Sequence, residues 1–150
     1  MWPERFAGDM CWSHPPQRSV TIEEMISVHR LLPSHAARFQ AVRLRGLREA
    51  PTAFGASYEE ECDQPVTAVA ERLATHRDGF ILGAFDDDTL VGVVGMQRDR
   101  HAKMRHKMVL WGMYVVPEAR GGGVGRRLVE EALRQAFATA GVLQVSLGVN

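Results

Sequence analysis

The sequence predicts one domain of the α/β (α+β) class, with a central mixed, mostly antiparallel sheet flanked by helices. Its 150 residues suit a single domain and leave no room for two full ones. Segments with the apolar patterns of strands and of helices succeed one another without an internal repeat. A long apolar run at 108–116 leads through a glycine-rich turn into a helical pattern and a final strand, which predicts one parallel crossover near the end.

Residues 1–19 show neither a helical nor a strand period, and we expect residues 1–24 to form a leader arm of uncertain order. We place the domain at residues 25–150. It begins with the apolar and β-branched residues 25–32, which predict a strand that ends at Pro33.

Two helices and a loop are expected after this strand. Residues 35–49 are rich in Ala, Leu and Arg, which predicts a helix with Ser34 as its N-cap. We expect residues 51–63 to form a loop that carries three consecutive acids. Residues 66–73 repeat apolar side chains at i, i+3, i+4 and i+7, which indicates a helix lying on the core.

A hairpin and a long strand form the centre of the predicted sheet. The apolar segments 80–85 and 89–96 flank Asp86–Asp88, and we interpret these acids as a solvated hairpin tip rather than a metal site. The run 108–116 is nearly continuous in apolar residues, which is typical of a strand covered on both faces. Gly112 within it predicts a β-bulge or the close approach of another backbone.

The last two predicted elements are a helix and a strand. The helical pattern continues to about residue 140, and Gly141 supplies a C-terminal stop. Its expected core-facing residues are Val129, Leu133, Ala136, Phe137 and Ala140. Residues 142–149 alternate apolar and polar side chains, as a strand with one buried face does.

Composition and charge exclude several classes of protein. Lys and Arg total 18 and Asp and Glu total 18, so the net charge of zero argues against nucleic acid or an anionic membrane as partner. No run approaches 18 apolar residues, so we expect no membrane span. Cys11 and Cys62 lie far apart, and we expect two unpaired thiols in a reducing, cytoplasmic compartment.

Residues 98–107 carry five Lys or Arg residues and one acid, Asp99. A patch for phosphate and a solvated loop between strands both fit this composition. We favour the solvated loop, because the spacing matches no metal or nucleic-acid motif.

The segment Arg120–Arg126 places four glycines between a predicted strand and a predicted helix. The first turn of a helix has free N–H groups and a partial positive charge, and glycines let a ligand come close. A phosphate or pyrophosphate is the natural ligand. A Walker A loop is excluded because neither Lys nor a hydroxyl follows Gly125, and a dinucleotide fingerprint because Arg126 stands where Gly or Ala belongs.

The remaining pattern is the R/Q-x-x-G-x-G/A loop of coenzyme A acyltransferases, which Arg120, Gly123 and Gly125 match at every fixed position. With the apolar strand before it, the segment Leu110–Leu128 resembles the GNAT superfamily of N-acetyltransferases. The resemblance covers roughly residues 25–150, and 51–61 is similar, more weakly, to the loop between the family's first two helices.

The resemblance implies acetyl-CoA as a co-substrate and no metal. The residues that it places at the pyrophosphate are Arg120, Gly121, Gly122, Gly123, Val124, Gly125 and Arg126. It also implies that the pantetheine arm pairs with the backbone of Met113, Tyr114 and Val115. The N–H of Met113 or of Tyr114 would then donate to the oxyanion that forms at the acetyl carbonyl.

The implied acceptor is a primary amine of a small molecule or a peptide. Glu59, Glu60 and Glu61 attract a cationic amine in one interpretation and are exposed charges beside a helix in another, with equal weight. No side chain is assigned as the general base, since 106–117 and 142–149 contain no acid. Two functions therefore stay open: transfer of acetyl to an amine by direct attack, and a non-catalytic acyl-CoA-binding or regulatory module.

The family continues beyond the last predicted strand with an Asn, a helix that carries a Tyr, and a hairpin. This sequence ends at Asn150, so we expect the fold to lack that helix and hairpin, together with the Tyr that protonates the leaving thiolate. The last strand would then present an open edge, which a homodimer would cover.

Overall fold

The computed structural model describes residues 25–75 and 77–148. The expected leader arm with Cys11 lies outside these residues, as do Val149 and Asn150. Among the described residues, Cys62 is a free, half-buried thiol, as the sequence predicts.

Five strands form one sheet in which neighbours in sequence are also neighbours in space. The strands are β1 (Ile26–Arg30), β2 (Gly79–Asp86), β3 (Thr89–Arg98), β4 (Lys107–Val115) and β5 (Gln144–Leu147). The first four strands are antiparallel to one another, and β5 runs parallel to β4. The predicted mixed, mostly antiparallel sheet with one crossover near the end is confirmed.

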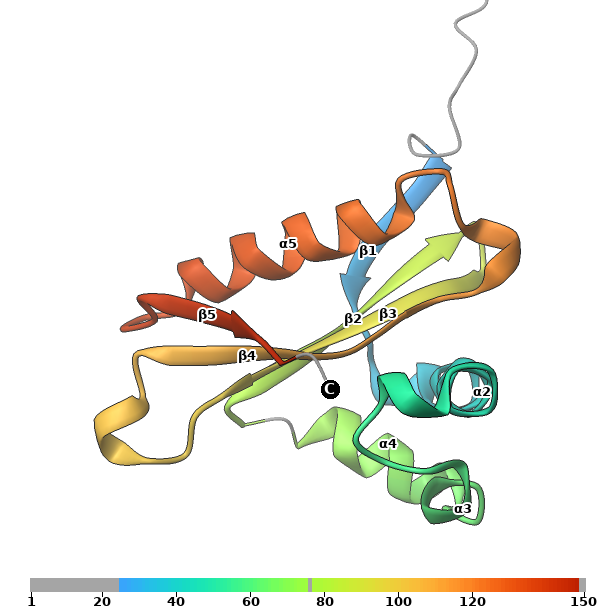
Figure 1. Cartoon of the computed structure of the whole chain (residues 1–150), viewed down its shortest axis with the longest axis horizontal. Helices are drawn as coiled ribbons and strands as arrows, with labels where there is room; N and C mark the ends of the chain where they lie inside the picture. Colours follow the sequence, from blue (N-terminus) through green and yellow to red (C-terminus); the bar gives the residue numbers. More distant parts are fainter. Residues whose placement is uncertain (1–24, 76, 149–150) are drawn as a thin grey trace, which may run out of the picture.

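Helices cover both faces of the sheet (Figure 1). They are α2 (Ala36–Glu49), α3 (Tyr58–Glu61), α4 (Val66–Ala74) and α5 (Val124–Ala138). The helix α5 lies on one face, whereas α2 and α4 pack against each other on the opposite face. The molecule therefore has three layers, and its core fills the two spaces between the sheet and the helices.

Two helix starts differ from the prediction, and local hydrogen bonds explain both. The expected loop at 51–63 contains α3, because Ser57 Oγ accepts from Glu60 N–H at 3.3 Å while the Glu60 carboxylate accepts from Ser57 N–H at 2.7 Å. This reciprocal capping box satisfies two donors that a helix start leaves free. The N-cap of α2 is His35 rather than Ser34, because Pro33–His35 form a 3-10 turn ahead of the helix.

The expectation that β4 is covered on both faces is wrong. The strands buried along most of their length are β2 and β3. In β4, Met108 and Leu110 are buried, whereas Val109 and Trp111 on the other face are only half-buried. The reason is that the layer of α2 and α4 stops short of this part of the sheet and leaves a cavity beside Trp111.

The buried face of α5 is rotated from the predicted one. Its buried residues are Val124, Leu128, Ala132 and Ala136. The helix comes so close to the sheet that a Cβ at Gly92 would lie 2.9 Å from Leu128 Cδ1. Phe137, expected in the core, is 53% exposed, and Leu143 and Leu147 around β5 are 78% and 65% exposed. The strand β5 pairs with β4 and packs against α5.

The strand β4 contains the bulge that Gly112 predicts. In the register with β3, Gly112 and Met113 together lie opposite the single residue Val94. The φ of Gly112 is +62°, a left-handed conformation that costs glycine no Cβ clash. Because of the additional residue, Trp111 and Tyr114 both face α2, while Met113 faces α5.

Replacing Gly112 with Ala tests how strongly this bulge depends on glycine. We expect the free energy of unfolding to fall by about 1–2 kcal/mol, because a Cβ is strained at this φ. The added Cβ would also lie 3.0 Å from Arg43 Nη1. Urea unfolding measures the loss, and Gly148→Ala, whose Cβ meets nothing within 4 Å, serves as the matched control. Equal stability of the two variants would contradict the assignment.

Candidate functional site

A gap opens beside the second half of β4. The parallel register with β5 runs from Lys107 opposite Gln144 to Leu110 opposite Leu147. From there β4 continues through residues 111–115, which have no β5 partner among the described residues. The backbone on this side of β4 can therefore pair with a ligand.

Two ladder bonds determine which backbone groups of β4 face this gap. Asp99 N–H donates to the Lys107 carbonyl at 3.0 Å, and Val116 N–H donates to the Val91 carbonyl at 2.9 Å. Bonded pairs recur at every second residue of an antiparallel ladder. Counting inward from both bonds therefore assigns residues 111 and 114 to pairs with β3.

The backbone groups of β4 that point into the gap are therefore those of the bulge residues and of Val115. Because the backbone of Tyr114 is directed at β3, the register favours Met113 over Tyr114 as an N–H donor toward the gap. The Val115 carbonyl on the gap side already accepts from Arg120 Nε at 2.9 Å. Of the three residues expected along the pantetheine arm, Met113 and Val115 therefore present backbone groups to the gap.

The glycine turn lies next to this gap. Gly123, with a φ of +81°, is the N-cap of α5, and the first backbone bond of the helix runs from Arg127 N–H to the Gly123 carbonyl at 3.0 Å. The first-turn amides ahead of that bond have no acceptor within the helix and carry the positive end of its dipole. A Cβ at Gly125 would lie 3.0 Å from Met113 Cε, so the turn lies against the side chain of a residue that borders the gap.

A polar cluster that local sequence patterns do not reveal holds the turn against the end of α2. Arg120 Nη2 donates to Glu49 Oε1 at 2.7 Å, and the Tyr114 hydroxyl donates to the other oxygen of the same carboxylate. Beside it, both terminal nitrogens of Arg45 donate to Glu118. Glu49 and Arg120 are 71 residues apart in the chain, so no local pattern connects them.

The charge state of this cluster follows from its contacts. The hydrogen bond from Tyr114, followed by that from Arg120, lowers the pKa of the Glu49 carboxyl. Burial, followed by the hydrogen bond to Glu49, raises the pKa of the Tyr114 hydroxyl. At neutral pH the carboxylate is therefore ionised and the phenol keeps its proton.

The three acids expected near the acceptor amine do not converge on one point. The Glu61 carboxylate forms a two-pronged ion pair with Arg43, with distances of 3.0 and 3.1 Å. Glu60 caps α3, and Glu59 is exposed. Two of the three therefore have structural partners, and their role toward an acceptor stays a prediction.

Arg43 is the one buried charged residue among the described residues, at 8% exposure. Its guanidinium lies 5.0 Å from the centre of the Phe54 ring and 5.7 Å from that of Trp111. Glu61 binds two of its nitrogens, whereas Nη1 is buried without a hydrogen-bond partner among the described residues. A guanidinium is thus fixed directly behind the bulge of β4.

The described residues contain neither a metal-binding cluster nor a membrane-spanning helix. Among residues 25–75 and 77–148 no group of three His, Cys, Asp or Glu side chains is arranged to hold a metal ion. Within the same residues no helix has the length and apolar character needed to cross a membrane.

The family model described as Acetyltransferase (GNAT) family matches residues 44–150 of the chain. The chain belongs to the GNAT acetyltransferase family. It is therefore a member of an acyl-transferring family, and the gap and glycine turn lie within the matched residues. A comparison with curated proteins gave no significant match.

Solved structures support the same fold. A GNAT-family acetyltransferase from Streptococcus pneumoniae superposes with a TM-score of 0.68 and 22% identity, covering 83% of this chain and 74% of the other. An aminoglycoside acetyltransferase from an uncultured soil metagenomic sample superposes with a TM-score of 0.65 and 20% identity, covering 83% of this chain and 80% of the other. A ribosomal-protein-alanine N-acetyltransferase from Brucella melitensis biovar Abortus gives 0.60 and 21%, also covering 83% and 80%. At these identities the likeness establishes the GNAT fold alone.

Glu61→Gln tests whether this acid is a structural partner of Arg43. We expect the free energy of unfolding to fall by about 3 kcal/mol, because the substitution leaves a buried guanidinium without its counter-charge. Chemical denaturation measures the effect, and Glu59→Gln, an exposed neighbour, should change stability little. Similar values for both variants would refute the structural role.

The Glu49 cluster predicts a pH-dependent contribution to stability. A carboxyl whose pKa is lowered by folding stabilises the fold above its ordinary pKa of 4.5 and loses that contribution as the pH falls through its folded value. The melting-temperature difference between the wild type and Glu49→Gln should therefore be full near neutral pH and shrink below about 4.5.

Tyr114→Phe provides the control for this pH dependence. It keeps the buried ring and removes the hydroxyl that most lowers the pKa of Glu49. In this background the effect of Glu49→Gln should be smaller and should vary less with pH. If Glu49→Gln changed the melting temperature of the wild type by the same amount at acid and neutral pH, the lowered pKa of Glu49 would be disproved.

Proposed function

We propose that this GNAT chain transfers an acetyl group from acetyl-CoA to a primary amine of a small molecule or peptide, in the cytoplasm. The observation that carries the proposal is the continuity of two backbone features, the gap beside β4 and the glycine turn of α5. They meet where a Cβ at Gly125 would lie 3.0 Å from Met113 Cε.

The backbone of the turn supplies the proposed binding site for the pyrophosphate of acetyl-CoA. The amides of residues 121–126 would point at its oxygens, and each bond to a charged oxygen is worth about 1.5–3 kcal/mol. The helix dipole adds attraction for the negative charge. The pantetheine arm would then run along the gap and pair with the backbone of Met113 and Val115.

The proposed chemistry is a direct attack. The amine nitrogen would bond to the thioester carbonyl carbon, the carbon–sulfur bond would break, and the sulfur would leave as the thiolate. The Met113 N–H would donate to the oxygen that becomes negative. The ammonium proton would pass to water, since β4 and β5 carry no acid.

Catalysis in this scheme rests on orientation. Holding two reactants in line contributes about 7–11 kcal/mol. A general base contributes about 10²–10⁴ in rate, which is a smaller effect. The absence of acids from β4 and β5 does favour a second candidate function, an acyl-CoA-binding or regulatory module without turnover. Release of free thiol from acetyl-CoA with a panel of amines separates the two functions.

Gly125→Val tests the binding site. The new side chain would fill the space between the first turn of α5 and β4, and its nearest neighbour is the flexible end of Met113. We expect the fold to survive and the affinity for coenzyme A to fall at least tenfold, about 1.4 kcal/mol. Calorimetry measures the affinity, and Gly148→Ala should bind as the wild type does.

The choice of position matters for this test. Gly123 is less suitable, because its φ of +81° would strain any side chain and disturb the start of α5 as well. Unchanged coenzyme A binding in Gly125→Val would overturn the placement. Binding in the wild type without thiol release for any amine would favour the second candidate function.

A further inference from the structure

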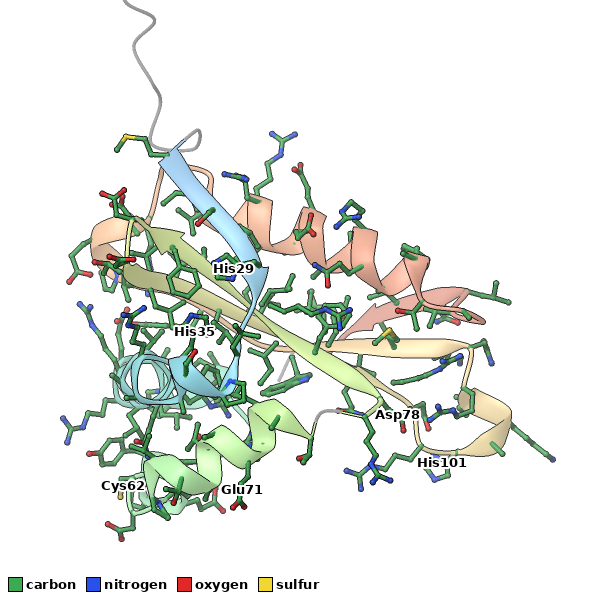
Figure 2. The ribbon with its side chains drawn as sticks, turned by 180° about the vertical axis from the view of Figure 1, so that it is seen from behind. His29, His35, Cys62, Glu71, Asp78 and His101 are labelled. Carbon is green, nitrogen blue, oxygen red and sulfur yellow. The ribbon has the colours of Figure 1, made fainter. Side chains whose placement is uncertain are left out.

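A second concave site lies on the α4 side of the sheet. This arginine cavity, about 500 Å³ in volume, is lined by Arg72, Arg77, Asp78, Gln97, Arg100 and Trp111, with Thr75 at its edge. Figure 2 shows Asp78 between the end of α4 and the loop that carries His101. The end of α4 with the segment that follows it, and the loop after β3, thus contribute arginines to one hollow.

The cavity has an excess of positive charge. Its one acid, Asp78, accepts a hydrogen bond from Arg105 at 2.7 Å, and this contact lowers the pKa of the carboxyl. Arg72, Arg77 and Arg100 form no ion pair within the described residues. The three arginines that line the hollow are exposed and carry like charges that repel one another, and an anionic ligand would relieve that repulsion.

The cavity reaches the strand where the acyl group is proposed to lie. Trp111 lines it and directly precedes the bulge residues Gly112 and Met113. The hollow of about 620 Å³ beside Glu59 and Glu60 has no lining residue from β4. Of these two hollows, the arginine cavity is therefore the one that touches the reacting strand.

The wall between the cavity and the bulge is formed by two tightly packed side chains, Trp111 and Arg43. The Trp111 ring packs over Gly95, where any Cβ would lie 2.2 Å from the ring. The guanidinium of Arg43 lies 5.7 Å from the centre of this ring, and its side chain is only 10% exposed. Its Nη1 has no hydrogen-bond partner among the described residues, although Glu61 balances the charge of the guanidinium.

We propose that the acceptor amine also carries an anionic group, a carboxylate or a phosphate, which binds in the arginine cavity. The inference rests on the proposed function and names the substrate class for the same site. The anionic group binds to Arg72, Arg77 and Arg100, and the amine extends past Trp111 to the gap beside β4. The positive surroundings disfavour an ammonium ion and so favour the neutral amine that attacks.

Matched pairs of amines test this directly. The pairs are β-alanine against β-alaninamide, for a carboxylate, and phosphoethanolamine against ethanolamine, for a phosphate. Binding is followed by NMR on the full chain, from the side-chain N–H signals of the three arginines and of Trp111. We expect the member with the anionic group in at least one pair to shift these signals and the member without it, a simple ammonium cation, to leave them in place.

Charge-matched variants distinguish binding in the cavity from a general attraction of anions to the positive charge of the protein. Arg72→Gln with Arg100→Gln should weaken binding of the anionic amine at least tenfold. Arg38→Gln with Arg134→Gln removes the same charge from exposed positions that do not line the cavity and should bind as the wild type does. Equal loss in both double variants, or signals that no anionic amine shifts, would overturn the proposal.

Turnover distinguishes this inference from the function on which it rests. With transfer present, the anionic member should have the higher kcat/KM, and the cavity variant should lose that preference through a raised KM. Arginine shifts without transfer for any amine would support the anion site and refute the transferase. Equal transfer to members with and without the anionic group, without arginine shifts, would leave the transferase standing and refute the anionic acceptor.

Discussion

The bulge in β4 is the constraint on which the remaining site depends. Two residues, Gly112 and Met113, occupy the space opposite Val94, and the alternation of side chains is reversed beyond them. Without this additional residue, the period of two would turn Tyr114 away from α2 and out of reach of Glu49. The same step frees the backbone at Met113 from β3 and leaves it beside the gap. A single glycine conformation thus sets both the polar cluster and the proposed acyl site.

Ion pairs from the helical layer hold the strand and the turn in this arrangement. Glu49 at the end of α2 binds Arg120, which in turn donates to the Val115 carbonyl, so the helix, the turn and β4 are joined through one carboxylate. Glu61 of α3 holds Arg43 of α2 behind the bulge. Both pairs join elements on one face of the sheet, while α5 approaches from the other face. The acyl-binding side of β4 is therefore supported from behind.

Local chemistry made part of this structure predictable. The apolar run that became β4, the bulge at Gly112 and the glycine turn before α5 each depend on a few neighbouring residues, and the sequence predicts all three. The buried face of α5 is predicted only in part. Ala136 is buried as expected, and Val129 and Leu133 pack against the core, whereas Phe137 is exposed and Ala132 takes a buried position that the pattern does not assign. Periodicity alone favours a large apolar residue such as Phe137, whereas close packing against a sheet can favour an alanine.

The polar partners could not be predicted in the same way, since they depend on tertiary distance. Arg43 and Glu61 are 18 residues apart, and Arg105 and Asp78 are 27 apart. The spacing of the basic segment 98–107 favours a solvated loop, yet Arg98 donates to the Ala140 carbonyl at 2.9 Å and Arg105 neutralises Asp78. With these two engaged, Arg100 is left to line the cavity with Arg72 and Arg77. The composition shows that this segment is basic. Only the fold shows which of its arginines form structural hydrogen bonds and which one lines the cavity.

The arginines that line the cavity also offer a way for an acceptor amine to lose its proton without a carboxylate on β4 or β5. A base removes a proton after or during attack, whereas a positive potential makes the ammonium ion unfavourable before attack. Three arginines around the cavity beside Trp111 create such a potential, and Asp78 does not cancel it because Arg105 already holds that carboxylate. An amine that brings its own anionic group is still attracted to this site, while a simple cation is repelled. The same arginines would therefore lower the pKa of the attacking amine and select an acceptor that carries an anionic group.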